Sequence, residues 1–406
     1  MRVLLSAYAC EPGKGSEPEV GWQRALHMAE AAEEVWVLTR SNNRAVIESN
    51  PLSGRAGLHF LYYDLPQWAL KLKKKAWFLP FYFVLWQWGA YRLAAKRHRV
   101  APFDCVYHVT FASLQYGSFM GRLGVPFVIG PIAGGERAPW PLRRTMPIRG
   151  KVTEFLRDLG ILIQRCSPLN RSAFAAAKRI YVTTADSLRL VPPKWRGKTS
   201  VLLAIASTGP SAQREDRRPP ESPRFIFAGR LLHWKGVHLL IRALAEARRT
   251  IPSATLSLIG NGPHEQWLRS VAAEAGVTEA VEFAGFLPRH LLIDSLYRYT
   301  AFIYPSLHDS GGFAALEALQ EGTPVICLDL GGPGIIVNST CGVVVPTAGA
   351  DEALTVTRIA DAMTLLGRLP EVEWQRLSTG AKARADELSW ASLTAQVIYR
   401  ESSFTV

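Results

Sequence analysis

Short apolar runs rich in aromatic and β-branched residues alternate with helix-like runs along the whole chain of 406 residues. In the first half the strand-like runs are VLLSAY, VWVLTR, LHFLYY, CVYHVT, PFVIGP and IYVTT, and in the second half they are FIFAG, TLSLIG, VEFAG, AFIYPS and PVICL. Strands that alternate with helices indicate parallel sheets covered by helices. The pattern therefore predicts an α/β protein, and the length allows two domains of ordinary size.

The boundary between the two domains is predicted in residues 207–224, STGPSAQREDRRPPESPR. This segment is rich in Pro, Ser and charged residues and almost devoid of apolar ones, which is typical of a linker. We therefore expect one domain over residues 1–206 and a second over residues 207–387. The stretch LSWASLTAQVIYRESS near the end of the chain predicts an amphipathic helix that begins after Ser389.

A strand, a loop and a helix follow one another in residues 300–320. TAFIYPSL predicts a buried parallel strand, and FAALEALQ predicts a helix. The loop between them contains Asp309, Ser310, Gly311 and Gly312. A glycine loop that joins a strand to a helix N-terminus can bind an anion, because unpaired N–H groups and the positive end of the helix dipole face the same point.

Two carboxylates belong to this segment. Asp309 stands at the carboxyl end of the predicted strand, where open α/β sheets bind their ligands. Glu317 falls one turn into the predicted helix, where it can accept hydrogen bonds from a diol such as a ribose. The alternative is a capped helix with a solvated glutamate.

The motif GRLLHWKG supplies two cations to the same half of the chain. Arg230 and Lys235 follow the strand-like run RFIFAG and precede a helical run that starts at Val237. Arginine binds phosphate as a bidentate fork and lysine as a point charge, so the pair can neutralise a departing diphosphate.

Residues 224–346 resemble the nucleotide-binding domain of retaining glycosyltransferases of the family 4 type. The matching pieces are GRLLHWKG, LSLIGNGP, VEFAGFL, the segment with Asp309 and Glu317, and GTPVICLDLGGPG. The resemblance implies the GT-B architecture, in which two Rossmann-like domains face each other across a cleft. It also implies a nucleotide-diphosphate sugar as donor, no further cofactor and no bound metal.

The resemblance assigns roles to individual residues. It implies that Arg230 and Lys235 hold the donor diphosphate and that Glu317 binds the ribose. The other positions implied at the donor are Ser310, Gly311, Gly312 and Phe313 beside sugar and phosphate, and Asn261 to Pro263 and Phe286 beside the base. The family usually has Glu where this chain has Asp309, and the shorter side chain bears on the identity of the donor sugar.

The first half offers two weaker candidates. Within the GT-B resemblance, the glycine loop after the first strand faces the donor, and Gly15 is the position expected to contact it; the alternative is a tight turn with a helix cap at Ser16. His108, at the end of the predicted strand CVYHVT, could orient the acceptor hydroxyl or the donor sugar, or be a satisfied interior histidine. In GT-B enzymes the last helix crosses back to the first domain, so residues 388–406 should complete it, with Trp390 as the aromatic anchor.

The net charge of +13 is concentrated in the first half. Residues 1–205 contain 29 Lys and Arg against 13 Asp and Glu, whereas the remaining residues contain 18 against 21. Such a domain attracts an anionic surface or acceptor, and charge alone allows nucleic acid, acidic polysaccharide or anionic lipid.

An aromatic block with basic flanks lies in residues 68–99, WALKLKKKAWFLPFYFVLWQWGAYRLAAKRHR. Its apolar part, residues 76–91, is too short to span a bilayer, which needs about 20 apolar residues, and Pro80 interrupts it. Trp and Tyr favour the headgroup level of a membrane, and Lys and Arg favour an anionic leaflet. The block predicts either an interfacial docking segment or a buried helix hairpin with solvated basic ends.

The cysteines argue against a disulfide framework or a zinc site. Their number is odd, their spacing is wide and no CxxC pair occurs. The five are Cys10, Cys105, Cys166, Cys327 and Cys341. We therefore expect a reducing compartment.

Together these observations predict a retaining, metal-independent glycosyltransferase that acts at the cytoplasmic face of the membrane on a lipid-linked glycan or an envelope polysaccharide precursor. Asp309 and His108 are the candidates for stabilising an oxocarbenium-like sugar. An anionic membrane surface is an expected partner and nucleic acid is not. The alternatives are a nucleotide-sugar hydrolase, phosphorylase or epimerase of the same architecture, and a non-catalytic basic membrane adaptor on a decayed transferase fold.

Overall fold

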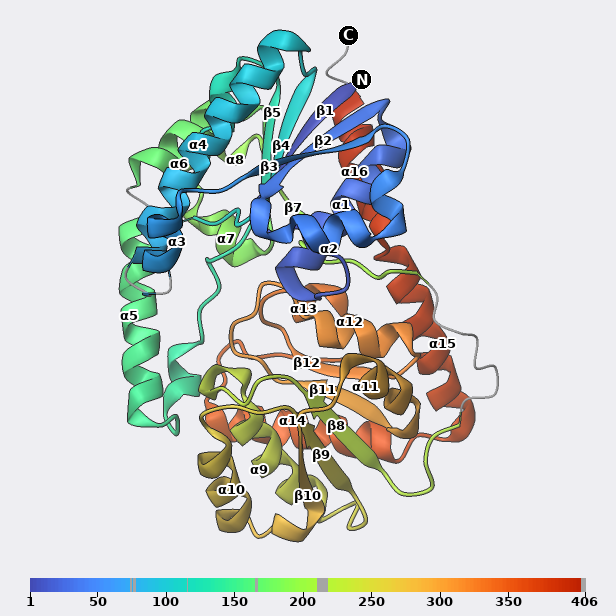
Figure 1. The fold of residues 1–406 in the computed structure, drawn as a ribbon. Helices are drawn as coiled ribbons and strands as arrows, with labels where there is room; N and C mark the ends of the chain where they lie inside the picture. Colours follow the sequence, from blue (N-terminus) through green and yellow to red (C-terminus); the bar gives the residue numbers. More distant parts are fainter. Residues whose placement is uncertain (74, 76–77, 115, 165–166, 210–217, 403–406) are drawn as a thin grey trace. The chain divides into compact units, whose positions relative to one another are not determined.

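The computed structural model describes residues 1–73, 75, 78–114, 116–164, 167–209 and 218–402, and the chain forms two compact units (Figure 1). The first unit consists of Met1–Gly135, Leu159–Ala204 and Trp390–Val406, and the second of Glu136–Asp158 and Ile205–Ser389. Part of the predicted linker, residues 210–217, lies outside the described residues.

The first unit is built on a seven-stranded sheet in the order β3-β2-β1-β4-β5-β6-β7, with all neighbours parallel. The strands are β1 (Arg2–Ala7), β2 (Glu34–Arg40), β3 (Leu58–Tyr63), β4 (Cys105–Thr110), β5 (Phe127–Ile132), β6 (Arg179–Val182) and β7 (Thr199–Val201). The helices are α1 (Ser16–Ala31), α2 (Arg44–Ser49), α3 (Gln67–Lys73), α4 (Leu79–Val100), α6 (Pro168–Ala176), α7 (Ala185–Leu190), α8 (Pro193–Arg196) and α16 (Trp390–Ser402).

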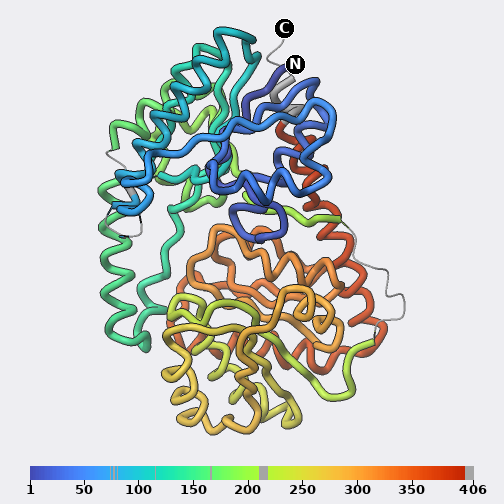
Figure 2. The backbone as a smooth tube through the Cα atoms, in the orientation of Figure 1, coloured from blue at the N-terminus to red at the C-terminus, as the bar shows by residue number. Residues whose placement is uncertain are grey.

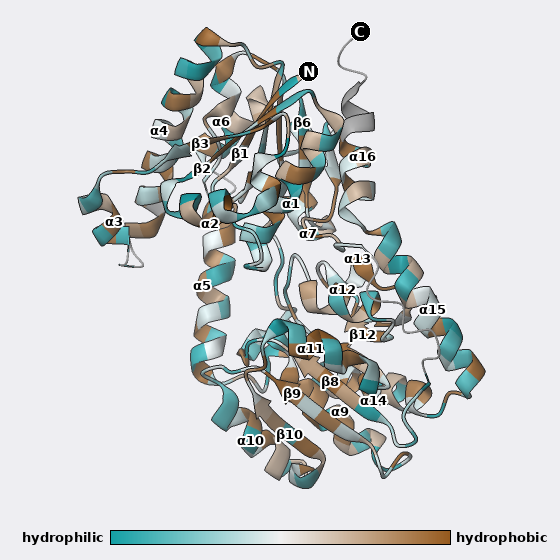
Figure 3. Cartoon of the chain, turned by 45° about the vertical axis from the view of Figure 1, so that its right-hand side comes forward, coloured by the Kyte–Doolittle hydropathy of each residue, from teal (hydrophilic) through white to brown (hydrophobic). Residues whose placement is uncertain are grey.

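The second unit is built on a six-stranded parallel sheet in the order β10-β9-β8-β11-β12-β13. The strands are β8 (Arg224–Ala228), β9 (Thr255–Ile259), β10 (Val281–Gly285), β11 (Ala301–Tyr304), β12 (Val325–Leu328) and β13 (Gly342–Val345). The helices are α9 (Val237–Ala247), α10 (Glu265–Glu274), α11 (Arg289–Ser295), α12 (Phe313–Gln320), α13 (Pro333–Ile336), α14 (Glu352–Gly367) and α15 (Glu371–Glu387). Apolar residues line the strands of both sheets (Figure 3). The predicted α/β class with parallel sheets is confirmed.

Single turns of 3₁₀ helix join several of these elements. They are η1 (Ser41–Asn43), η2 (Pro51–Gly54), η4 (Met120–Leu123), η5 (Trp140–Arg143), η6 (His233–Lys235), η7 (Thr278–Ala280) and η8 (Leu296–Arg298). Two of them adjoin features described below, since η6 lies within GRLLHWKG and η5 precedes α5 (Ile148–Gln164).

The segment Glu136–Asp158 packs with the second unit, although the predicted boundaries had placed it in the first domain. Figure 2 traces it as a green tube that continues into α5. The reason is a set of polar contacts between residues far apart in the sequence, which no local pattern predicts. For example, Thr145 N–H donates to Glu352, and Arg242 donates to the Thr145 hydroxyl at 2.7 Å. Helix α5 therefore begins in the second unit and ends in the first.

The end of the chain packs in the first unit. Helix α16 lies against α1, and the Arg24 guanidinium is 5.3 Å from the ring centroid of the buried Trp390. This is the position at which the sequence placed the crossing helix and its aromatic anchor.

The aromatic block divides between core and surface. Tyr82, Phe83 and Trp86 of α4 are buried. Tyr8, which directly follows β1, packs edge-on against Phe83 and Trp86, with distances between ring centroids of 5.0 and 4.8 Å. The interpretation as buried helix is therefore correct for these three residues. Phe81 of the same helix is 62% exposed, and the block's Lys74, Ala76 and Trp77 lie outside the described residues.

Within the described part of the chain, none of the helices combines the length and the apolar character needed to cross a bilayer. The four cysteines in that part are all buried and free, and Cys166 lies outside it.

Candidate functional site

The predicted donor residues converge at one edge of the second sheet. The strand order reverses between β8 and β11, which are hydrogen-bonded neighbours. The loop after β8 carries GRLLHWKG, and the loop after β11 carries the DSGG sequence. Open α/β sheets bind ligands at such a switch point, outside the carboxyl ends of the strands.

Lys235 and Asp309 form an ion pair where these two loops meet. The Lys235 ammonium donates to Asp309 Oδ2 and, at 2.6 Å, to the Tyr304 hydroxyl, while that hydroxyl donates to the same Oδ2 at 2.7 Å. Asp309 Oδ1 accepts from the Gly311 N–H at 3.0 Å. Both oxygens of the carboxylate are therefore engaged by groups of its own unit.

The electrostatics of this pair follow from its burial. Burial acts to raise the pKa of Asp309, but the neighbouring Lys235 charge and the hydrogen bonds from Lys235, Tyr304 and Gly311 outweigh it and lower the pKa below its ordinary value. Burial and the adjacent Asp309 charge raise the pKa of Tyr304 well above its ordinary value. The Tyr304 phenol therefore stays protonated and remains a hydrogen-bond donor at neutral pH.

Gly236 allows the two loops to approach. It has φ of +70°, and a Cβ at this position would lie 1.9 Å from the Pro305 carbonyl oxygen. Any other residue would suffer both the strained left-handed backbone and this clash. Gly236 thus brings Lys235 within reach of the Asp309 loop.

Glu317 lies on α12 with its side chain mostly buried. Its Oε1 accepts from Arg289 Nε of α11 at 2.7 Å. The alternative of a solvated glutamate is therefore not what the structure shows, and the predicted ribose contact stays a prediction. A ribose hydroxyl would add to this pair or replace Arg289.

The remaining predicted donor residues lie at the carboxyl ends of the same strands. Arg230 and Asn261 are exposed after β8 and β9, and Phe286 is 73% exposed after β10. Ser310 and Gly311 are partly exposed, and Gly312, with φ of +102°, is the N-cap of α12, which begins at Phe313. The sheet topology therefore brings the residues named from the second half to one edge.

The two first-half candidates belong to the other unit. Gly15 is the N-cap of α1, with φ of +68° and open space where a Cβ would stand. His108 is fully buried in β4, and its Nδ1 is 3.0 Å from Ser6 Oγ. Burial lowers the pKa of His108 to about 4, so the imidazole is neutral. These are the features of an interior histidine, and a role of His108 at a donor or acceptor stays a prediction.

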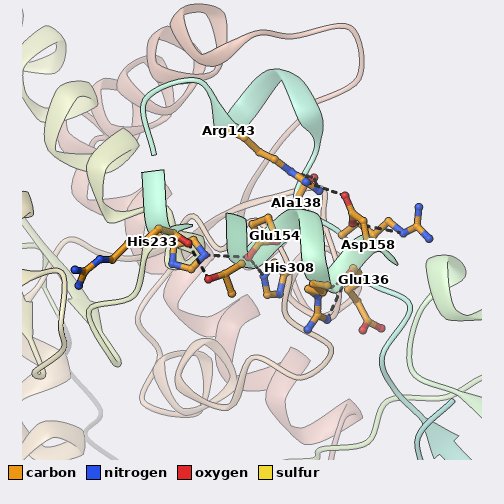
Figure 4. A network of polar contacts seen from close by, with 11 residues as sticks. Glu136, Ala138, Arg143, Glu154, Asp158, His233 and His308 are labelled. Carbon is orange, nitrogen blue, oxygen red and sulfur yellow. Dashed lines mark hydrogen bonds and ion pairs between the residues drawn. The ribbon is translucent and has the colours of Figure 1, made fainter. Parts of the chain in front are cut away.

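A buried glutamate that sequence reasoning missed connects the two loops that carry Lys235 and Asp309 (Figure 4). Glu154 Oε1 of α5 lies 3.0 Å from His233 Nε2 and 3.0 Å from His308 Nε2. A carboxylate can only accept, so both imidazoles donate through Nε2. His233 precedes Lys235 by two residues and His308 directly precedes Asp309, so one carboxylate ties the backbone of both loops to α5.

The charge state of this network follows from its contacts. Burial acts to raise the pKa of Glu154, but the hydrogen bonds from His233 and His308 outweigh it and lower the pKa to about 2. Burial lowers the pKa of His308, against the opposing effect of Glu154, and the Trp234 ring stacks on His308 at 4.5 Å. Glu154 is 79 and 154 residues away from its two partners along the chain, and no local sequence pattern marks it.

The chain is similar to known glycosyltransferases. Residues 210–365 match the family described as glycosyl transferases group 1. The match therefore covers most of the second unit. A glycogen synthase of Mycobacterium tuberculosis is 35% identical over 187 residues, which cover 45% of this chain and 44% of that protein.

Two further relatives extend the comparison beyond the matched residues. A GDP-mannose-dependent alpha-(1-6)-phosphatidylinositol monomannoside mannosyltransferase of Mycobacterium tuberculosis is 29% identical over 243 residues, 57% of this chain and 58% of that protein. The chain thus spans about half the length of these curated relatives. The structure of a sucrose-phosphate synthase from Thermosynechococcus elongatus superposes with a TM-score of 0.65 at 17% identity and covers all of both chains. The predicted similarity to group 1 glycosyltransferases and the GT-B fold with two Rossmann-like domains are confirmed.

Proposed function

We propose that the protein is a retaining, metal-independent glycosyltransferase that moves a sugar from a nucleotide-diphosphate donor to a lipid-linked glycan or an envelope polysaccharide precursor. The observation that carries the proposal is the meeting of Lys235 and Asp309 at the β8/β11 switch point, beside the N-terminus of α12. This combination of cation, glycine loop and helix start suits a diphosphate leaving group.

Stabilisation of the leaving diphosphate is the main demand of the reaction. Lys235, oriented by Asp309 and Tyr304, provides a fixed charge with little freedom to move, and the exposed Arg230 side chain on the same loop provides a fork for phosphate oxygens. Groups held in place before the reaction need little reorganisation when charge develops. The departing phosphate can accept the acceptor's proton, so the reaction requires no strong protein base.

Asp309 acts in this proposal as electrostatic support and not as a nucleophile. Both of its oxygens are engaged, by Lys235 and Tyr304 on one side and by the Gly311 N–H on the other. These three hydrogen bonds stabilise the negative charge and lower the pKa of Asp309, which weakens the carboxylate as a nucleophile. The negative charge still lies close enough to favour an oxocarbenium-like sugar.

The nucleoside is assigned to the other end of the same edge. Glu317 binds the ribose diol and shares or releases Arg289, while Asn261 and Phe286 border the base. Ser310, Gly311, Gly312 and Phe313 contribute backbone at the sugar and phosphates, and for Gly15 a donor contact is proposed from the resemblance alone. These roles rest on the resemblance and on the placement of the loops at one sheet edge.

The proposals for the acceptor and the location rest on the charge of the first half of the chain and on one of the matched relatives. The first half of the chain carries the excess of Lys and Arg, and the matched mannosyltransferase is named for a phosphatidylinositol-based acceptor. We propose a membrane-bound anionic acceptor and a peripheral position on the cytoplasmic face, without a nucleic-acid partner.

The direct test is sugar transfer from labelled donors to an acceptor extract, with donor breakdown measured in parallel without extract. Arg230→Ala and Glu317→Ala should each lower donor turnover by about 10- to 100-fold, as expected for the loss of a charge-assisted hydrogen bond. Arg269→Ala, which removes an exposed cation of α10 in the same unit, is the matched control and should leave turnover unchanged.

The outcomes separate the alternatives. Turnover without extract indicates a hydrolase or epimerase, and turnover that requires only phosphate indicates a phosphorylase. Wild-type turnover in both site variants would show that the site is misassigned. A thermal-shift screen with UDP, GDP, ADP and TDP identifies the nucleotide, because a ligand that binds the native state raises the unfolding temperature; failure of all four would favour a non-catalytic adaptor.

A further inference from the structure

Helix α5 has an inverted distribution of polar and apolar residues. Its two acidic residues, Glu154 and Asp158, lie on the face that packs against the rest of the protein. Glu154 bonds to the two histidines, and Asp158 Oδ2 bonds to Arg143 Nη1 at 2.8 Å (Figure 4). The inner face is therefore anchored by ion pairs and hydrogen bonds.

The outer face of α5 consists of large apolar side chains. Seven of them are between 46% and 73% exposed. They are Ile148, Val152, Phe155, Leu156, Leu159, Leu162 and Ile163, which we call the α5 stripe. At 100° per residue these positions fall within an arc of about 120° on one side of the helix. A continuous exposed apolar surface of this length is a mark of an interaction site.

Cations border the α5 stripe. Arg149 and Lys151 are exposed and fall on opposite edges of the arc, and no acidic residue of α5 lies outside the inner face. Trp140 of η5, just before the helix, is 66% exposed, with the Arg143 guanidinium 4.5 Å from its ring centroid. Trp favours the headgroup level of a bilayer, and Lys and Arg favour its anionic lipids.

We propose that the α5 stripe is the surface by which the protein docks on a membrane of anionic lipids, with the helix lying in the plane of the interface. An apolar arc with cations on both edges fits a lipid surface, which offers acyl chains below negatively charged headgroups. This inference rests on the peripheral location in the proposed function and assigns that location to a specific helix. Docking itself does not depend on catalytic turnover.

The location has a consequence for the donor site. Glu154 joins the inner face of α5 to the loops that carry Lys235 and Asp309. A helix held at the membrane surface by its outer face therefore holds those loops at a defined distance from lipid acceptors.

The test is flotation of the purified full chain with phosphatidylcholine vesicles and with vesicles that also contain phosphatidylglycerol. The wild-type chain should float with the anionic vesicles and at least about tenfold less with the neutral ones. The double variant Phe155→Ser with Leu156→Ser should reduce binding to anionic vesicles about tenfold or more. Arg149→Glu with Lys151→Glu should abolish the preference for anionic lipid.

A matched control removes equally exposed apolar groups from elsewhere in the second unit. Leu365 and Val372 are 56% and 61% exposed, against 57% and 59% for Phe155 and Leu156. Leu365→Ser with Val372→Ser should leave flotation unchanged, and all variants should keep the wild-type unfolding temperature. Donor breakdown in solution should also be unchanged in the α5 variants, so loss of docking and loss of the proposed function can be told apart.

The proposal fails if the wild-type chain does not float preferentially with the anionic vesicles. Two further results would overturn it. One is wild-type flotation of the Phe155→Ser/Leu156→Ser variant. The other is a wild-type dimer in sedimentation that this variant converts to a monomer, because a second copy of the chain would then cover the α5 stripe.

Discussion

Helices α4 and α5 are both rich in apolar residues, yet they use them in opposite ways. The aromatic residues Tyr82, Phe83 and Trp86 of α4 face inward and form part of the first unit's core. On α5 the inward positions hold Glu154, Asp158 and the buried Ile161, and seven large apolar side chains face outward. The denser aromatic segment is thus mainly structural, and the less conspicuous helix carries the larger exposed stripe.

The comparison shows why apolar content alone does not locate an interaction surface. Burial of a side chain depends on which neighbours reach it, and α4 meets Tyr8 and the sheet of the first unit. Helix α5 contacts His233, His308 and Arg143. Their buried polar groups are stable only when they are hydrogen-bonded, so α5 presents polar side chains to them. The polar face of α5 is therefore turned inward and its apolar face is left outside.

The largest effect on the free energy of unfolding is expected from Trp86→Ala in α4, which tests the contrast between the two helices. Trp86 is fully buried and donates from Nε1 to the Tyr63 carbonyl at 2.9 Å. Truncation leaves a cavity and an unpaired carbonyl, so the free energy of unfolding should fall by about 3–5 kcal/mol. Urea denaturation measures this loss of free energy. Trp88→Ala on the same helix, where the ring is 41% exposed, should cost clearly less, and equal losses would contradict the assignment of α4 to the core.

Glu154→Ala in α5 should have the next largest effect. It leaves the Nε2–H groups of two buried histidines without their acceptor, at about 1–3 kcal/mol for each group. Nucleotide affinity should fall with stability, because the loops of Lys235 and Asp309 lose their common anchor. Thr153→Ala, the exposed neighbour on α5, is the control and should change neither quantity. Unchanged nucleotide affinity in Glu154→Ala would refute the link between α5 and the loops.

The contribution of Glu154 to the free energy of unfolding should depend on pH, and the direction of this dependence follows from its pKa. The pKa of Glu154 is about 2 in the native chain and 4.5 in its ordinary state. Between these values the unfolded chain binds a proton that the native chain does not, so the contribution of this carboxylate is complete above pH 4.5 and is lost as the pH falls toward 2. The stability advantage of wild type over Glu154→Gln should therefore shrink by up to roughly 3 kcal/mol across this window. Denaturation curves at pH 5.5 and pH 3 test it, and a constant difference would contradict the paired state.

The smallest effect should come from Phe155→Ser in the α5 stripe. Its ring is 57% exposed, and a surface substitution of this kind usually changes the free energy of unfolding by less than about 0.5 kcal/mol. Urea denaturation in the absence of lipid is the measurement. A loss as large as that of Trp86→Ala would show that the outer face of α5 is covered, and the contrast between the two helices would fail.

Much of the fold was predictable because its signals are local. Alternating strand-like and helical runs specify parallel βαβ units, and the predicted helix 313–320 coincides with α12. The donor candidates of the second half could also be named from sequence, because the loops and the helix start that carry them follow parallel strands, whose carboxyl ends lie at one edge.

The predictions that failed or stayed open depend on contacts between distant residues. The segment Glu136–Asp158 was placed with the wrong half, since its partners Glu352, His233 and His308 lie far along the chain. The pairing of Glu317 with Arg289 of another helix was not predicted, and its ribose contact stays a prediction.

By itself, then, the sequence determined the α/β class, the order of strands and helices, and the set of cations, glycines and carboxylates at the donor edge, since all of these are encoded in short stretches of chain. Only the tertiary structure decided that Asp309 is held by Lys235 and Tyr304, that Glu154 connects the loops of Lys235 and Asp309, and that α5 exposes seven large apolar side chains. These features arise from pairs of groups brought together by folding, and burial and hydrogen bonding at each position depend on neighbours that no local pattern specifies.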